Sequence, residues 1–201
     1  MKTLLILAAA TAALTATSAP PEKITSEQIQ KIAPKLLEPA GRISGAQFKI
    51  DPDSDKGDGL KGGEVGVVVL PDRNLTAEKL EKAGSEIIPL GQLYLKGVVP
   101  AKNGKPADND RMHILMIEDK GETHRIWLCL LGARKNGDKL ELVLYGSEKA
   151  PLSQVALRKV ESAQDLPIEV SGEKQDDESA SLTLNILGKY KATLVVMKQE
   201  G

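Results

Sequence analysis

The sequence contains a single cysteine, Cys129, among its 201 residues. An intramolecular disulfide is therefore excluded, and the hydrophobic core has to hold the fold without covalent cross-links. Cys129 lies in the apolar segment 126–131, which predicts a buried thiol. Because apolar surroundings raise the pKa of a thiol, this position disfavours a role as a nucleophile.

Aromatic residues and net charge are scarce as well. The chain has one Trp, one Phe and three Tyr, and its formal net charge is −1. Proteins that bind polysaccharides or single-stranded nucleic acids stack their ligands on several exposed rings. Proteins that bind nucleic acids or anionic membranes carry a basic surface. The composition therefore disfavours these classes, and we expect no nucleic-acid partner.

Apolar runs are short. The run Leu4–Leu14 has about half of the roughly 20 residues that a membrane-spanning helix needs, so we expect no membrane span. Lys2 precedes the run and small residues follow it, which is the layout of a secretory signal peptide. We expect residues 1–18 to be cleaved off after Ser18. No cysteine stands at this junction to accept a lipid, so we expect a secreted or periplasmic bacterial protein.

The remainder of the chain has the size of one ordinary domain. We expect an N-terminal helical segment over residues 19–40, followed by a single antiparallel β domain over residues 41–201. Thr25 or Ser26 is suited to cap the helix. The apolar stripe of this short helix is Ile29, Ile32 and Leu36, and the prolines expected to disturb and end it are Pro34 and Pro39.

From Ile43 onward the pattern changes to short apolar alternations separated by clusters of Gly, Asn, Asp and Lys, which is typical of hairpins. A short surface helix over residues 75–84 interrupts them. We count about nine or ten strands, including 64–70, 87–99, 111–118, 122–131, 152–160 and 166–170. This predicts a mainly β fold, an antiparallel β-sandwich or barrel-like structure, and the alternation does not separate the two.

Two hairpins have a predicted register. Asn136–Gly137 suits a type I′ turn, which places Leu131 opposite Leu142. Away from the turn both faces of this hairpin are apolar, so we expect it to be covered on both sides. The second is the C-terminal hairpin, where a three-residue loop over 187–189 puts Ile186 opposite Tyr190 and keeps one face apolar.

The acidic segment 51–64 has the composition of a metal site. Counted from Asp53, carboxylates fall at positions one, three, six and twelve, which are Asp53, Asp55, Asp58 and Glu64. Calcium prefers clustered carboxylates on a loop that curls round it. In this spacing the segment resembles the loop of an EF-hand, but Gly57 and Asp58 at positions five and six depart from that pattern. The resemblance implies a Ca²⁺ site, and the alternative is a solvated hairpin connection.

His113 and His124 are the only histidines. If the turn at 119–121 pairs Glu118 with Glu122, the two imidazoles lie on opposite faces, whereas a slip of one residue brings them onto the same face. No Cys, Asp or Glu stands at ligand spacing beside either one, which favours two ordinary strand histidines over a metal site.

The pattern favours an exported, non-catalytic β domain that acts as a binding or structural module for an unknown protein or small molecule of the cell envelope or extracellular space. One alternative is a carrier of an apolar, lipid-like molecule in a cavity formed by the N-terminal helix and a barrel or half-barrel. Another is a metal-dependent enzyme that uses the 51–64 segment or the two histidines. No catalytic residue is assigned.

Expression of the full chain in a bacterium tests the leader. We expect the recovered protein to begin at Ala19, because leader peptidases cut after small residues such as Ser18. Intact-mass measurement and N-terminal sequencing identify the first residue. A recovered protein that still begins at Met1 would contradict the predicted cleavage.

Overall fold

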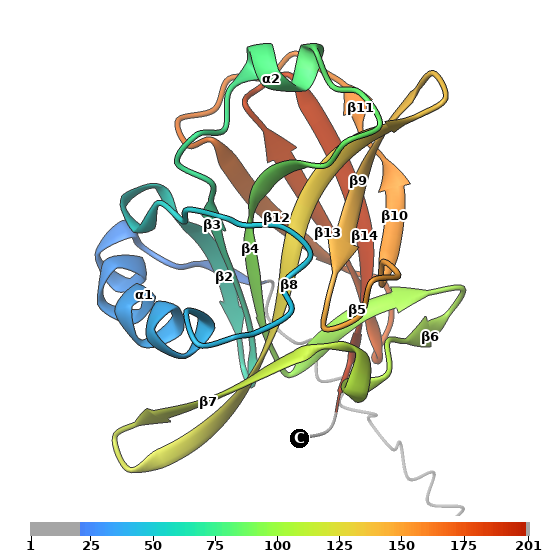
Figure 1. The fold of residues 1–201 in the computed structure, drawn as a ribbon. Coiled ribbons are helices and arrows are strands. Elements are labelled where there is room, and N and C mark those ends of the chain that lie inside the picture. The colour runs from blue at the N-terminus through green and yellow to red at the C-terminus, as the bar shows by residue number, and fades with distance from the viewer. Residues whose placement is uncertain (1–20, 200–201) are drawn as a thin grey trace, which may run out of the picture.

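The structure, a computed structural model, describes residues 21–199, and the predicted signal peptide lies outside them. The fold is mainly β, with 14 strands in two antiparallel sheets, which confirms the predicted fold class as a sandwich-like structure. Helix α1 (Ser26–Ala40) lies against the outside of one sheet, and the short helix α2 (Ala77–Glu81) lies at one end of the molecule (Figure 1). Two single 3₁₀ turns are η1 (Ser54–Lys56) and η2 (Asn109–Arg111).

The first sheet has eight strands in the order β1-β2-β3-β4-β8-β9-β10, with β7 also paired to β8. The second sheet has six strands in the order β12-β13-β14-β5-β6, with β11 paired to β14. Their bounds are β1 (Glu22–Lys23), β2 (Asp58–Gly62), β3 (Val65–Pro71), β4 (Ile88–Lys96), β5 (Val98–Lys102), β6 (Lys105–Pro106), β7 (His113–Asp119), β8 (Glu122–Asn136), β9 (Lys139–Tyr145), β10 (Ser153–Ala156), β11 (Arg158–Lys159), β12 (Ile168–Lys174), β13 (Ser179–Ile186) and β14 (Tyr190–Lys198).

The strand count exceeds the predicted nine or ten for two reasons. Three short strands, β1, β2 and β6, were not predicted, and the chain passes from one sheet to the other inside two predicted strands. Segment 87–99 breaks at Gly97, whose φ of 69° turns the chain from β4 in the first sheet to β5 in the second. Segment 152–160 breaks at the buried Leu157, between β10 and β11. Strands that change sheet at a bend are the corners of two-sheet structures. The prediction of two continuous strands was therefore wrong.

One large apolar core fills the space between the sheets and contains Trp127, Cys129 and Leu184. The opposite face of the first sheet is also covered. Part of it packs against α1, and another part, around Leu130 and Tyr145, packs against Phe48. The β8–β9 hairpin is therefore buried on both faces, as predicted.

Helix α1 lies within the predicted helical segment 19–40 and ends where that segment ends. Thr25 is its N-cap, and the Thr25 side chain and the backbone N–H of Gln28 form one half of a capping box. The helix continues through Pro34, which does not end it, and it ends at Ala40, one residue after Pro39. Packing against the sheet offsets the roughly 3 kcal/mol that an interior proline costs a helix. The buried contacts are made by Ile29, Ala33 and Leu36.

The two hairpin predictions had different outcomes. The C-terminal register is confirmed, with Ile186 opposite Tyr190. In the β8–β9 hairpin the loop is Gly137–Asp138, so Leu131 faces Leu144 and not Leu142. Gly137 has φ 60° at the first loop position, which is the position of glycine in a type II′ turn. Each β8 residue thus faces a β9 residue two positions from the predicted one. Because side chains alternate between the faces with a period of two, the same side chains remain on the buried face.

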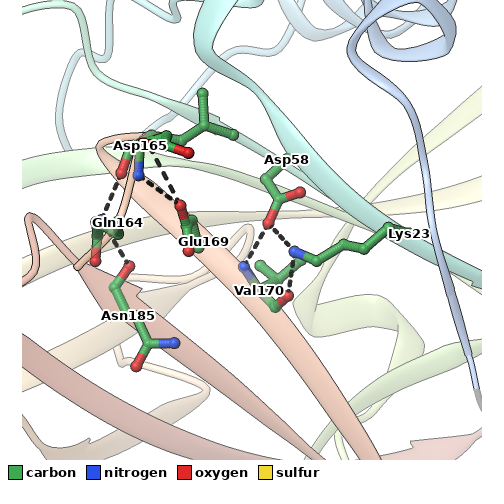
Figure 2. Close-up of polar contacts among 8 residues, drawn as sticks. Lys23, Asp58, Gln164, Asp165, Glu169, Val170 and Asn185 are labelled. Carbon is green, nitrogen blue, oxygen red and sulfur yellow. Dashed lines mark hydrogen bonds and ion pairs between the residues drawn. The ribbon is translucent and has the colours of Figure 1, made fainter. Parts of the chain in front are cut away.

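A polar contact joins the two sheets where β2 lies beside β12 (Figure 2). Asp58 Oδ2 accepts a hydrogen bond from the backbone N–H of Val170 at 2.7 Å and forms an ion pair with Lys23. Lys23 Nζ also donates to the Val170 carbonyl at 2.6 Å. Asp58 is only 5% exposed, and no strand pairing joins β2 to β12 within residues 21–199. The side chains of Asp58 and Lys23 therefore bond the strand edges at this seam.

The seam predicts a stability effect. We expect Asp58→Ala to lower the free energy of unfolding by about 1–3 kcal/mol, because it leaves the buried N–H of Val170 without an acceptor. Urea unfolding measures the change. Asp55→Ala is the matched control, since Asp55 is exposed, and we expect a change within about 0.5 kcal/mol. Equal losses from the two substitutions would contradict the role of Asp58.

Candidate functional site

The acidic segment 51–64 does not form a single loop. Asp55 lies in η1, Asp58 begins β2, and Glu64 lies in the turn before β3. Asp53 and Asp58 are buried, whereas Asp55 and Glu64 are exposed. Within residues 21–199, no three His, Cys, Asp or Glu side chains come together as a metal ion requires. Ca²⁺ binding by these four residues stays a prediction from the sequence, without support from their geometry.

The buried carboxylate of Asp53 is surrounded by the protein's own cations. Lys56 Nζ lies 3.8 Å from Asp53 Oδ2, and Arg73 Nη1 lies 3.8 Å from Asp53 Oδ1. The N–H of Asp55 donates to Asp53 Oδ1 at 3.3 Å, which caps η1. Asp53 thus fixes the shape of its own segment, as Asp58 fixes the seam.

The two histidines lie on the same face of the β7–β8 hairpin. The loop is Lys120–Gly121, with Asp119 opposite Glu122, so His124 faces Ile117 and His113 faces Leu128. Both loop residues have positive φ, which a two-residue type I′ turn requires. His113 and Ile117 are four residues apart, which separates the two imidazoles by about 13 Å along the strand. They share a face but do not meet.

Cys129 lies in the core between the sheets and is fully buried. Burial raises the pKa of its thiol to about 12. The thiolate, which is the nucleophilic form, is therefore scarcely populated at neutral pH. The prediction of a buried thiol is confirmed.

A polar hollow of about 420 Å³ lies beside the loop 162–167. Gln164 and Asp165 of this loop bond to β13 and β12 (Figure 2). Gln164 Nε2 donates to the carbonyl of Pro167 at 3.2 Å, and Glu169 Oε1 accepts the N–H of Asp165 at 2.9 Å. These contacts hold the loop in place, whereas Gln164 Oε1 is buried without a hydrogen-bond partner among the described residues.

An apolar groove, hereafter the helix groove, lies between α1 and the outer face of the first sheet. It has a volume of about 200 Å³. Its apolar wall combines residues of α1 with residues of β3, β4, β7 and β8, which are Ile32, Leu36, Val68, Tyr94, Ile117 and Ile126. Ile29 and Leu36 of the predicted helix stripe pack fully against the sheet, whereas Ile32 at its margin stays half-buried and borders the groove. The groove thus forms because the apolar face of α1 is wider than the part of that face that packs against the sheet.

One end of the helix groove is polar. Lys35 of α1 and Asp119 at the tip of the β7–β8 hairpin form an ion pair of 2.7 Å there. The Lys35 ammonium lowers the pKa of Asp119 by hydrogen bonding and by its charge. Lys96 and His124 line the same end. The groove therefore combines an apolar wall with a charged rim.

Gly66 keeps the groove open beside Lys96. A Cβ at this position would meet only the Cβ of Lys96, at 3.7 Å. The glycine is therefore not required by backbone geometry or by crowding. A larger side chain at position 66 fits the strand and would occupy the groove.

Only part of this groove is indicated by the sequence. Ile32 and Leu36 were predicted as helix packing residues, and His124 was considered only as a partner of His113. Lys96, Gly66 and Ile117 were missed, because their strands are brought together by pairings that no local pattern specifies. A glycine in the middle of an apolar strand was the one available signal.

Comparisons of the chain with protein-family models, with curated proteins and with solved structures find no match. The function therefore has to be argued from the geometry. Within the described part of the chain, no helix is both long and apolar enough to cross a membrane.

His113 predicts a pH dependence of stability. Burial lowers its pKa from 6.5, against an opposing hydrogen bond with the Gly146 backbone. The unfolded chain therefore takes up the proton at a higher pH than the folded protein, and stability falls as the pH drops below about 6.5. We expect a lower melting temperature at about pH 5.5 than at about pH 7.5, and a smaller difference in His113→Gln.

His124→Gln is the matched control, because it removes a histidine from the same face of the hairpin. It is expected to keep the acid-induced fall. If His113→Gln retains the full difference between the two pH values, burial of His113 is not its cause.

Proposed function

We propose that this chain is an exported, non-catalytic binding module of the cell envelope or extracellular space, and that its ligand occupies the helix groove. The signal-peptide layout of residues 1–18 supports export. The groove carries the binding role, because a concave apolar surface with a few polar groups is the usual form of a ligand site.

The composition of the groove supports binding over catalysis. Among the described residues that line it, none carries a thiol or an aliphatic hydroxyl. Its acidic group, Asp119, is held by Lys35. Nucleophilic catalysis needs a nucleophile within hydrogen-bond reach of a base, and Cys129 lies in the core between the sheets.

The groove also favours one form of the carrier alternative. It lies between the N-terminal helix and a β-sheet, where that alternative expects its ligand. Its volume of about 200 Å³ is below the roughly 300–1,000 Å³ of most ligand pockets, which restricts a small-molecule ligand to a short single chain. A bulky lipid is not favoured.

Binding of 1-octanol, a small neutral probe, tests the proposal. We expect saturable amide chemical-shift changes in Val68, Lys35 and Ile117 on titration. In Gly66→Leu the added side chain fills the groove, and we expect the affinity to fall at least about tenfold.

Gly84→Leu is the control for the added leucine. Gly84 is exposed, a Cβ there meets nothing within 4 Å, and it lies outside the groove. Its octanol affinity should equal that of the unmodified protein. Absence of saturable shifts, or equal affinities in the two leucine variants, would count against the groove as the binding site.

A further inference from the structure

The helix groove is polarised along its length. Tyr94 and Lys96 lie on the same face of β4, two residues apart, with Tyr94 toward the apolar end and Lys96 toward the rim. On β8, Ile126 lies beside Lys96 on the same face, and His124 lies two residues farther toward the rim. A ligand that fits this surface is apolar at one end and polar at the other.

The charges at the rim are not equivalent. Lys35 is neutralised by Asp119 at 2.7 Å, and His124 Nε2 lies 4.0 Å from Glu122. Lys96 forms no ion pair with a carboxylate in residues 21–199, and it is only half exposed. The rim therefore has one ammonium group available for an anion.

The space beside this ammonium is open. Gly66 lies opposite Lys96 in the β3–β4 pairing and contributes no side chain to the groove. A Cβ at position 66 would have contact only with Lys96. A head group is thus able to approach Lys96 while its chain lies against Val68 and Ile126.

We propose that the helix groove binds a single-chain amphiphile with an anionic head, a short fatty acid, whose carboxylate pairs with Lys96 and whose alkyl chain lies against the apolar wall. This inference rests on the proposed function and names its ligand class. The volume of about 200 Å³ favours one short chain over a two-chain phospholipid. A carboxylate suits a lysine ammonium at a half-exposed position, where the ion pair strengthens binding by about fivefold.

A comparison of octanoate with 1-octanol distinguishes binding in the groove from selection of an anionic head, because the two probes share a chain length and differ in head charge. We expect the purified protein to bind octanoate about fivefold more tightly than octanol, and the preference to shrink at high salt. In Lys96→Met, which keeps most of the aliphatic side chain, we expect equal affinities for the two probes.

Two further variants serve as controls. Lys96→Arg keeps the charge and should keep the preference for octanoate. Lys102→Met removes an exposed lysine of β5 outside the groove and should leave both affinities unchanged.

The outcomes separate the claims. Equal binding of octanol and octanoate, or a preference that survives Lys96→Met, overturns the fatty-acid inference and leaves the binding module in place. If neither probe binds, or if Gly66→Leu binds both like the unmodified protein, the proposed function fails and the inference fails with it.

Discussion

The structure depends on one carboxylate at the seam between its two sheets. β12 is the edge strand of the second sheet and lies beside β2 without a strand pairing in the described residues, so the polar groups at its edge need other partners. Asp58 supplies one by accepting the N–H of Val170, and Lys23 supplies another by donating to its carbonyl. The ion pair itself contributes little net stability, because Asp58 loses its hydration on burial while the Lys23 side chain stays 54% exposed to solvent. The ion pair acts instead on position. It fixes which strands lie side by side at the seam, and it fixes the residues that lead into α1.

The helix groove follows from that position. Lys23 is fixed at the seam, Ile24 borders the groove, and Thr25 caps α1, so three consecutive residues lead from the seam to the helix. With its start fixed, the helix lays Ile29 and Leu36 on the sheet and leaves Ile32 at the margin. The ion pair between Lys35 and Asp119 then holds the helix to the tip of the β7–β8 hairpin. The groove therefore has this ion pair at its polar end and apolar side chains along the rest of its wall.

Local sequence patterns predicted the structural features that depend only on residues close together in the chain. The cap at Thr25, the buried Cys129 and the C-terminal hairpin register each follow from a few adjacent positions, and each is confirmed. The changes of sheet at Gly97 and Leu157 were missed, because an alternating pattern continues through a corner when both sheets share one core. The partner of Asp58 lies 35 residues away in the chain, so its carboxylate resembled a calcium ligand. The groove was missed for the same reason, since its walls come from five elements.

The seam also bears on the order in which the molecule assembles. The hydrogen bond from Lys23 to Val170 joins residues 147 positions apart, so it forms only after most of the chain is available. Contacts of such long sequence separation slow folding, because the entropy of closing the loop is lost before the contact is gained. The contact between the N-terminal strand and β12 therefore waits for the last third of the chain, whereas α1 packs against strands that end before it. Under the proposed export, this late contact would leave the N-terminal strand free of β12 while the chain is translocated.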